Sequence, residues 1–303
     1  MSRGGTSRIA FIGLGNMGVP MAGNLVTAGH DVTGFDLVAA NNDRAKGEGV
    51  RIASSARDAL EDADLLVTML PAGRHVLAVY EDLIPALPDG ALAIDCSTID
   101  VASARAAHGM CAERGVASID APVSGGVGGA SAGTLTFMAG GSAEAFARAE
   151  PILQPMAGRV VHCGDGGAGQ AAKICNNMIL GISMIGVSEA FVLAERLGLD
   201  HQALFDVAST ASGRCWSLDT YCPVPGPVPS SPANNGYRPG FAADLMLKDL
   251  RLAQEAASVN GAATPLGAAA SQIYALMAAS GEGGRDFSAV VEFLRGDSAT
   301  ARD

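Results

Sequence analysis

One lysine stands in an apolar stretch of the chain, where a solubilising charge is not expected. Among the 20 basic residues only Lys46, Lys173 and Lys248 are lysines, and Lys173 opens an apolar run that continues to Leu180. Unlike arginine, a partly buried lysine can have its pKa lowered enough to accept and release a proton. The alternative is an amphipathic lysine whose ammonium reaches water along its aliphatic stem. Taken alone, the residue leaves both interpretations open.

A glycine-rich segment supplies donors that suit a carboxylate. Residues 120–129 read Asp-Ala-Pro-Val-Ser-Gly-Gly-Val-Gly-Gly and follow a predicted strand. A hydroxyl and unobstructed backbone N–H groups in one loop can surround a carboxylate with short hydrogen bonds. A flexible glycine linker is the alternative, but residues 130–135 lead directly back into predicted structure. The segment is therefore a candidate substrate loop.

A second glycine pattern points to a dinucleotide cofactor. It follows a predicted strand, opens a predicted helix, and consists of Gly13, Leu14, Gly15, Asn16, Met17 and Gly18. The first glycine of such a pattern permits a tight turn, the second admits a pyrophosphate, and the third lets helix and strand pack closely. Free N–H groups at the start of the helix then bind the anion.

The acidic residue that follows selects between the two nicotinamide cofactors. Asp36 ends the second predicted strand, where a carboxylate accepts hydrogen bonds from the hydroxyls of an adenosine ribose. A 2'-phosphate would be repelled there, and residues 37–40 contain no arginine to offset the repulsion. We therefore expect NAD as the cofactor.

Two more segments end predicted strands at the edge where ligands of parallel sheets bind. The first contains Leu70 and Pro71, and the second contains Thr98. Thr98 could bond the ribose or the carboxamide of the cofactor, or it could cap the helix that follows it. Both interpretations remain open.

The elements that position these residues fall into two groups. Up to about residue 165, short apolar strands alternate with helical stretches, a pattern typical of a doubly wound parallel sheet of the α/β class. The predicted strands are 9–12, 32–35, 65–69, 91–95, 117–120, 134–139 and 160–163, and the predicted helices between them include 20–28, 56–61 and 101–114. We predict a Rossmann domain over residues 1–165 and an all-helical domain over 166–303.

The second half reads as helix almost throughout. The predicted helices are 169–197, 203–209, 241–259, 265–280 and 287–294. The helix 169–197 is apolar nearly all round, which predicts a buried core helix, and we expect Gly181 and Gly186 to allow close packing. Gly198 is placed to end this helix and Asp200 to cap the next one. Five prolines in residues 222–232 predict a stiff loop, either a lid or an exposed connection.

Composition excludes several classes of protein. The net charge is −11 with no basic run, so nucleic acid and anionic membranes are poor partners. Residues 178–194 are too short and too polar to span a bilayer, and we expect them to be buried. Six cysteines without a CxxC pair predict reduced thiols and a cytoplasmic protein. The five histidines show no spacing typical of a metal site, so we expect no metal.

Four motifs in order give the chain a resemblance to the beta-hydroxyacid dehydrogenases, from about residue 9 to residue 295, and among them to the branch that oxidises 3-hydroxyisobutyrate. The motifs are the glycine pattern at 13–18, the loop at 120–130, the segment Gly-Gln-Ala-Ala-Lys-Ile-Cys-Asn-Asn at 169–177, and Leu-Lys-Asp-Leu at 247–250. The resemblance implies a Rossmann domain joined by a long helix to a helical domain, with the active site in the cleft between them.

The resemblance also implies roles for individual residues. Lys173 would be the catalytic lysine, Ser124, Gly125 and Gly126 the cradle for the substrate carboxylate, and Asn177 a further substrate contact. Lys173 and Asn177 are four residues apart and so share one face of a helix, which agrees with these roles. Lys248 would lie beside the cofactor and, together with burial, would lower the pKa of Lys173.

The implied reaction is the NAD-dependent oxidation of a primary alcohol to a semialdehyde, here methylmalonate semialdehyde in valine catabolism, with Lys173 as general acid and base. The proline-rich loop and Trp216 also resemble this branch. We hypothesise that Trp216 forms an apolar wall against the methyl group of the substrate, although a tryptophan is more often part of a core.

Several alternatives remain. Within the enzymes, the chain could reduce tartronate semialdehyde or succinic semialdehyde. A non-catalytic NAD(P)-binding module and an imine reductase are disfavoured, because such relatives lack a lysine at the position of Lys173. An apolar helical domain commonly buries surface in an oligomer, so we expect a homodimer or homotetramer.

Overall fold

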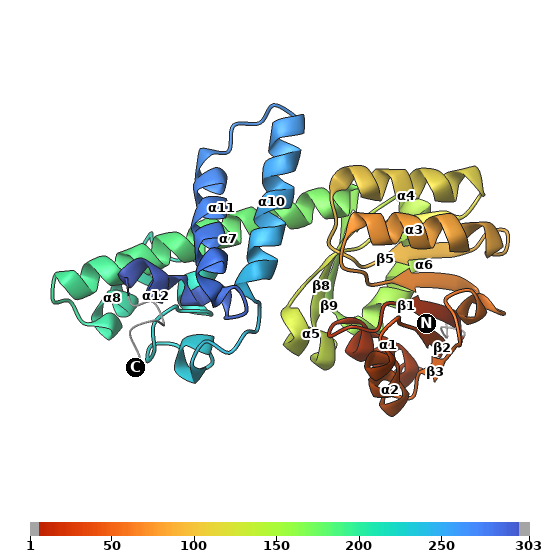
Figure 1. Ribbon diagram of the computed structural model, residues 1–303, viewed down its shortest axis with the longest axis horizontal. Helices are drawn as coiled ribbons and strands as arrows, with labels where there is room; N and C mark the ends of the chain where they lie inside the picture. The colour runs from red at the N-terminus through yellow and green to blue at the C-terminus, as the bar shows by residue number, and fades with distance from the viewer. Residues whose placement is uncertain (1–5, 297–303) are drawn as a thin grey trace. The chain divides into compact units, whose positions relative to one another are not determined.

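The computed structural model describes residues 6–296 of the chain, and its elements alternate in the first half and are helical in the second (Figure 1). The chain divides into two units, Met1–Lys173 and Ile174–Asp303. This division falls inside one helix, after the change of sequence pattern near residue 165. The outer ends of the ranges expected from the sequence, 1–5 and 297–303, lie outside the described residues.

The first unit is built on a single sheet. Its strands are β1 (Arg8–Ile12), β2 (Asp31–Phe35), β3 (Arg51–Ile52), β4 (Leu65–Thr68), β5 (Leu92–Asp95), β6 (Ala117–Asp120), β7 (Val123–Ser124), β8 (Leu135–Gly140) and β9 (Ala157–Gly164). The order is β3-β2-β1-β4-β5-β6-β8-β7, with β9 beside β8. The first six are parallel, whereas β8 runs antiparallel to β6 and β7. The parallel part has the Rossmann strand order, as predicted.

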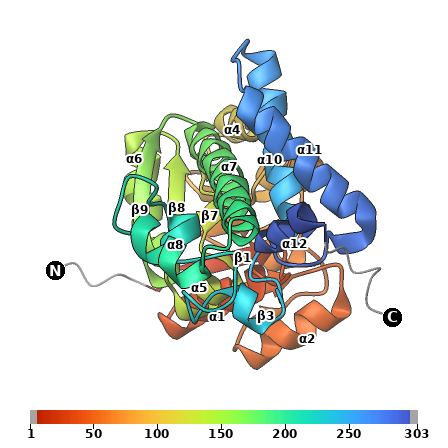
Figure 2. The same ribbon diagram turned by 90° about the vertical axis from the view of Figure 1, so that its left-hand side faces the viewer.

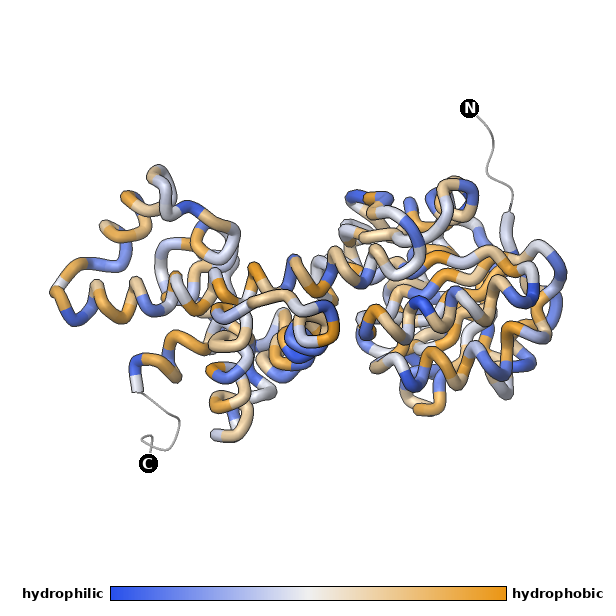
Figure 3. The backbone as a smooth tube through the Cα atoms, turned by 90° about the horizontal axis from the view of Figure 1, so that it is seen from above, coloured by the Kyte–Doolittle hydropathy of each residue, from blue (hydrophilic) through white to orange (hydrophobic). Residues whose placement is uncertain are grey.

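The helices of the first unit cover both faces of this sheet. They are α1 (Gly18–Thr27), α2 (Ala39–Gly47), α3 (Gly73–Leu83), α4 (Val101–Glu113), α5 (Gly126–Ala132) and α6 (Ala143–Leu153). Successive residues of β1 point to opposite faces, so Ile9 and Phe11 enter one core cluster with α1 and α6, and Ala10 and Ile12 enter another with α3 and α4. Figure 1 shows α3 and α4 side by side. Figure 3 shows hydrophobic segments in the interior of the first unit, in orange.

The seven predicted strands are confirmed, with ends that differ by a few residues. The predicted crossover helix at 56–61 is wrong, because only a short 3₁₀ turn forms there (Asp58–Leu60). The prediction did not name the helices α2, α3, α5 and α6 of the first unit.

The second unit is helical, as predicted. Its helices are α7 (Ala168–Arg196, which begins in the first unit), α8 (His201–Ala208), α9 (Trp216–Asp219), α10 (Ala243–Val259), α11 (Pro265–Met277) and α12 (Val290–Arg295). The helices α10 and α11 lie against each other (Figure 2). Gly198 adopts a positive φ of 75° after α7, and the Asp200 side chain accepts hydrogen bonds from the N–H groups of Gln202 and Ala203, so both predicted helix signals are confirmed.

The long helix α7 is less buried than expected. Met184 and Phe191 are fully buried, but Ile179 and Leu193 are 64% and 59% exposed. Gly181 does allow close packing, since a Cβ there would lie 3.2 Å from Leu250, whereas a Cβ at Gly186 would meet nothing within 4 Å. The prediction for Gly186 is therefore wrong.

The same helix is long and apolar enough, by length and composition alone, to cross a membrane. This corrects the expectation that the segment is too short and too polar. One such helix is weak evidence for a membrane, because the core helix of a globular protein passes the same test.

Candidate active site

The glycine loop between β1 and α1 has the geometry that a pyrophosphate requires. Gly13 has a φ of +97°, and a Cβ there would lie 2.3 Å from the Met69 carbonyl oxygen. A Cβ at Gly18 would lie 1.9 Å from the Gly13 carbonyl oxygen, so helix and loop meet through this residue. A Cβ at Gly15 would meet no protein atom within 4 Å. Two glycines are thus required by the fold, and the third leaves open space where a ligand can approach the backbone.

Asp36 lies beside this loop at the end of β2. Its Oδ2 accepts a hydrogen bond from the Leu14 N–H at 2.8 Å, and its Oδ1 accepts from the Val38 N–H at 2.8 Å and the Asn41 side chain at 3.1 Å. The Asn42 side chain bonds both the N–H and the carbonyl oxygen of Asp36. These contacts fix the carboxylate next to the glycine loop. The open space at Gly15 and the placed acid therefore fit an NAD cofactor.

The other predicted cofactor residues lie in the same unit. Leu70 donates its N–H to the Ser97 hydroxyl at 2.7 Å, which joins the ends of β4 and β5, and the neighbouring Pro71 is exposed. Thr98 is half-buried and follows Ser97. The interpretation of Thr98 as a helix cap is wrong, because Asp100 caps α4. In the glycine loop, Met17 is half-buried and exposed Asn16 accepts a hydrogen bond from Arg44 at 3.3 Å, a contact the sequence did not indicate.

Asp95 is a buried carboxyl group at the end of β5 that the sequence analysis did not single out. Its Oδ1 accepts hydrogen bonds from the Thr68 hydroxyl at 2.8 Å and from the N–H and hydroxyl of Ser97. Its Oδ2 is buried and has no hydrogen-bond partner. Burial raises the pKa of Asp95 to about 6, although the hydrogen bonds from Ser97 and Thr68 oppose this.

We expect Asp95→Asn to remove part of the pH dependence of stability. Because the pKa of Asp95 is higher in the folded state, folding takes up a proton between about pH 4 and pH 6. The contribution of this group to the free energy of unfolding is present below about pH 4 and falls by about 3 kcal/mol as the pH rises through 6. The Tm of Asp95→Asn relative to wild type should therefore be higher at pH 7.5 than at pH 4.5. An equal difference at both pH values, or the same trend in a control Asp89→Asn at an exposed site, would contradict this prediction.

Lys173 lies in the second turn of α7 and is buried, with 5% of its surface exposed. Its Nζ donates a hydrogen bond to the Val123 carbonyl oxygen at 2.8 Å. The side chain therefore does not extend along the surface to water. Val123 immediately precedes Ser124, so the ammonium lies within the candidate substrate loop, next to Ser124 in the sequence.

That loop is ordered rather than a flexible linker. Val123 and Ser124 form the short strand β7, and Gly125, at a φ of +132°, leads into α5. Gly126 also has a positive φ, of 61°. A Cβ at Gly125 would approach the Leu135 side chain to 3.1 Å, so the turn packs against β8. The structure thus brings Ser124, Gly125 and Gly126 together near Lys173.

The start of α7 is attached to the ends of β5 and β6. The Gln170 side chain accepts from the Ile99 N–H at 3.0 Å and donates to the Ser97 carbonyl oxygen at 2.7 Å. The Asp120 carboxylate accepts from the Gly167 and Gln170 N–H groups. Gln170 and Asp120 stand in two of the sequence motifs, but the motifs indicate no role for either residue. Their partners lie 47 to 73 residues away in the chain, so no local signal could have revealed them.

In the second unit the structure brings three motif residues together. The Asn177 side chain is buried and donates to Asp249 Oδ2 at 2.5 Å. The ammonium of Lys248 lies 3.2 Å from Asp249 Oδ1. Asp249 thus orients Asn177 and pairs with Lys248. The sequence did not indicate this role, although Asp249 stands in the Leu-Lys-Asp-Leu motif at 247–250.

Trp216 is not part of a core. It is 50% exposed and stacks on Tyr221 with ring centroids 4.8 Å apart, and Tyr221 donates its hydroxyl hydrogen to Asp286 at 2.9 Å. The proline-rich loop that follows is packed into the hydrophobic core of the second unit. The Ser231 hydroxyl bonds the Cys222 carbonyl oxygen at 2.6 Å, and both residues are buried. This loop is therefore a packed part of the helical unit and not merely an exposed connection.

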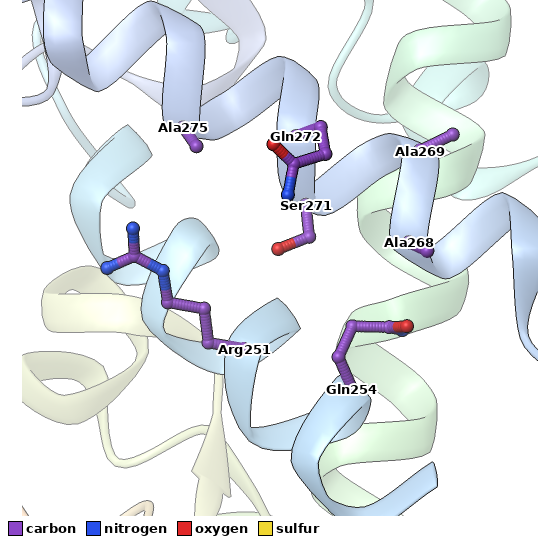
Figure 4. A pocket seen from close by; sticks show the side chains of 7 residues that line it. All are labelled: Arg251, Gln254, Ala268, Ala269, Ser271, Gln272 and Ala275. Carbon is purple, nitrogen blue, oxygen red and sulfur yellow. The ribbon is translucent and has the colours of Figure 1, made fainter. Parts of the chain in front are cut away.

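A cavity in the second unit is lined by other residues. It has a volume of about 610 Å³ and lies between α10 and α11, with Arg251, Gln254, Ser271 and Gln272 among its lining residues (Figure 4). None of the predicted site residues lines it. Within residues 6–296 no group of three histidine, cysteine or acidic side chains is placed to hold a metal ion, and the six cysteines are free.

Comparison with known proteins identifies two family models that together span most of the chain. Residues 8–164 match the NAD binding domain of 6-phosphogluconate dehydrogenase, and residues 167–294 match a model described as NAD-binding of NADP-dependent 3-hydroxyisobutyrate dehydrogenase.

Individual relatives agree with these models. The Mycobacterium tuberculosis protein named "Probable 3-hydroxyisobutyrate dehydrogenase" is 53% identical over 287 residues, which are 95% of this chain and 97% of the relative. The NAD-dependent L-serine dehydrogenase of Pseudomonas aeruginosa is 47% identical over 286 residues, 93% and 96% of the two chains. A solved structure of Mycobacterium tuberculosis 3-hydroxyisobutyrate dehydrogenase with L-serine has a TM-score of 0.94 at 52% identity and covers 96% of this chain and 100% of that chain.

These matches cover both units, and they confirm the resemblance that the four motifs carry. They also establish an oxidoreductase with an NAD-binding domain. The chain belongs to the 3-hydroxyisobutyrate dehydrogenase family.

Proposed function

We propose that this protein oxidises 3-hydroxyisobutyrate to methylmalonate semialdehyde with NAD, and that Lys173 is its general acid and base. The observation that carries the proposal is the buried ammonium of Lys173, held 2.8 Å from the Val123 carbonyl oxygen at the start of the loop with Ser124 and two positive-φ glycines. A proton-transfer group and a set of carboxylate donors thus lie in one unit.

In the proposed reaction the loop binds the substrate and the lysine moves the proton. The Ser124 hydroxyl and the N–H groups of Gly125 and Gly126 hold the carboxylate, which fixes the substrate hydroxyl toward Lys173. The glycine loop and Asp36 would hold NAD, which would supply the acceptor for the hydride of the carbinol carbon. Lys173 in its neutral form takes the hydroxyl proton, and in the reverse direction its ammonium donates a proton to the aldehyde oxygen. Asn177, one helical turn from Lys173 and oriented by Asp249, is proposed as a further substrate contact.

The direct test is NADH formation from (S)-3-hydroxyisobutyrate, measured beside NADP and beside D-glycerate, 3-hydroxypropionate and L-serine. We expect the highest kcat/KM with 3-hydroxyisobutyrate and NAD, because the Asp36 carboxylate disfavours a 2'-phosphate. Turnover on D-glycerate alone would instead assign a tartronate semialdehyde reductase, and NAD binding without turnover would assign a binding module.

A second candidate is the oxidation of L-serine. It is favoured by the 47% identical relative of that name and by the solved relative with L-serine. L-serine shares the carboxylate and the primary alcohol with 3-hydroxyisobutyrate and carries an ammonium in place of the methyl group. The same loop and lysine would act on both, so the residues beside this substituent decide between them. A higher kcat/KM for L-serine would select this candidate.

We expect Trp216→Ala to reduce the preference for 3-hydroxyisobutyrate over 3-hydroxypropionate by about threefold to tenfold. A pocket gains roughly 1–3 kcal/mol from one additional methyl group, and loss of one apolar wall removes part of this. The measurement is the ratio of the two kcat/KM values. Because Trp216 stacks on Tyr221, Tyr221→Phe serves as a control that keeps the aromatic stack. An unchanged ratio would place the wall elsewhere.

We further propose that the protein is a cytoplasmic homodimer or homotetramer. The exposed apolar residues Ile179, Leu193 and Leu197 of α7 and the segment after it support an oligomer, since water is a poor environment for such a stripe. Light scattering coupled to size-exclusion chromatography tests the proposal, and a monomer at micromolar concentration would contradict it.

A further inference from the structure

A buried carboxylate joins the start of α7 to the sheet of the first unit. Asp120 ends β6 and is 2% exposed. Its Oδ1 accepts hydrogen bonds from the Gly167 N–H at 2.7 Å and from His108 Nε2 at 2.9 Å, and its Oδ2 accepts from the Gln170 N–H at 2.9 Å. Three donors, from α4, from the turn before α7 and from α7 itself, thus converge on one side chain.

His108 in α4 supports this carboxylate from the other side. Because a carboxylate oxygen only accepts, His108 Nε2 carries the hydrogen of the shared bond. The other ring nitrogen, Nδ1, lies 2.6 Å from the Ser118 hydroxyl, so both ends of the imidazole are held. A Cβ at Gly166 would lie 2.8 Å from the ring, which means that the turn before α7 packs directly on His108.

Asp120 is connected to both partners of the hydrogen bond between Lys173 and Val123. Two residues separate Asp120 from Val123 along the chain. The Val123 carbonyl oxygen accepts a hydrogen bond from the Lys173 ammonium at 2.8 Å. Through its N–H partners, Asp120 also fixes the first turn of α7, and Lys173 follows Gln170 by three residues. The hydrogen bond between Lys173 and Val123 therefore closes a ring of contacts that includes Asp120.

We propose that Asp120, held in orientation by His108, is the positioning residue for Lys173. This inference rests on the proposed function of Lys173 as general acid and base. Asp120 does not itself touch the reacting atoms; it holds the start of α7 at the depth and rotation that bring the Lys173 ammonium to the substrate loop. Hydrogen bonds to charged groups are among the stronger ones in proteins, so loss of one can displace a helix end.

The variants of this site should still fold, because the attachment of α7 has a second part. The Gln170 side chain bonds the Ile99 N–H and the Ser97 carbonyl oxygen independently of the Asp120 carboxylate. Loss of one acceptor oxygen at Asp120 thus leaves α7 attached and shifts only its first turn. The change is then visible in catalysis rather than in the amount of folded protein.

The first test is Asp120→Asn, whose amide nitrogen cannot accept the hydrogen bond of the Gln170 N–H. We expect kcat per NADH-binding site to fall by about tenfold to a hundredfold, with the affinity for NADH within about twofold of wild type. Asp200→Asn is the matched control, because Asp200 also accepts N–H groups at the start of a helix but lies at the exposed α8 cap. It should keep the wild-type kcat.

The second test uses two replacements of His108. Gln can donate to Asp120 as the imidazole does, whereas Leu cannot. We expect His108→Leu to lower kcat by about fivefold to tenfold and His108→Gln to recover most of this loss. Equal losses in both variants would overturn the inference, since a role in packing alone does not depend on the donor.

The third test separates positioning of Lys173 from a general structural role. In a double-mutant cycle, Asp120→Asn should lower kcat strongly in wild type but by less than about twofold in a Lys173→Ala background. An equal further loss in that background would overturn the inference while leaving the role of Lys173 intact. Wild-type activity of Lys173→Ala would overturn both.

Discussion

We expect Lys173→Ala to lower kcat by about a hundredfold to ten-thousandfold, the range that a positioned general acid or base contributes, and to leave NAD binding close to wild type. The loss follows from the geometry of the first unit, where Lys173 is the buried ammonium beside the Ser124 loop. We expect NAD binding to be retained, because the glycine loop and Asp36 are positioned by their own contacts, such as the hydrogen bond from the Leu14 N–H to Asp36. The measurement is steady-state kcat with NADH affinity from fluorescence titration.

A second replacement distinguishes proton transfer from charge. Lys173→Arg keeps a cation and hydrogen-bond donors, but arginine cannot release its proton under working conditions. We expect it to be nearly as inactive as Lys173→Ala. Lys46→Ala, at an exposed lysine of α2, is the control and should keep full activity. Substantial activity in Lys173→Arg would mean that the residue supplies positive charge only.

Gly169→Ala is expected to lower the Tm by about 5 °C or more, since overpacking of backbone against backbone costs about 3 kcal/mol or more. A Cβ at Gly169 would lie 2.2 Å from the Met138 carbonyl oxygen and 2.6 Å from that of Asp120. Both are main-chain atoms of the sheet and cannot rotate away. Helix propensity alone predicts the opposite sign, because alanine is favoured over glycine by roughly 1 kcal/mol.

The matched control is Gly109→Ala in α4, where a Cβ would meet nothing within 4 Å. We expect this variant to have an unchanged or higher Tm, as propensity predicts. Calorimetry of both variants gives the measurement. A Gly169→Ala variant that is as stable as wild type would mean that α7 can cross the sheet edge at a greater distance.

Most of the sheet could be predicted from the sequence because buried parallel strands are short, apolar and bounded by turn residues. Two of the missed helices, α2 and α5, lack the corresponding signal, whereas α3 and α6 each bury residues at helical spacing and could have been predicted. Ala39–Gly47 is polar with only Ala45 buried, so it has no apolar face to detect. Gly126–Ala132 contains three glycines, and local propensity opposes the helix that forms there. In that case tertiary contacts, such as those with Leu135, outweigh propensity.

The candidate site was predictable where chemistry is carried by a motif and unpredictable where it depends on contacts between distant residues. The residue types and the motif positions of Lys173, Ser124 and Asp36 predict the roles proposed for them. The role of Asp120 depends on a histidine in another helix and on N–H groups 47 and 50 residues further along. The same holds for Asp249, which acts on Asn177 from 72 residues away.

Two of the three donors that reach Asp120 are main-chain N–H groups, from Gly167 and Gln170. A substitution cannot delete an N–H group unless it introduces proline, so these bonds persist through most sequence drift at their own positions. Substitutions are therefore tolerated less at Asp120, the single acceptor, than at the residues that donate to it. In a population of variants, the anchor of α7 should therefore tolerate many changes in the helix and very few at residue 120, and a library designed to alter substrate preference can vary the loop while leaving this one carboxylate unchanged.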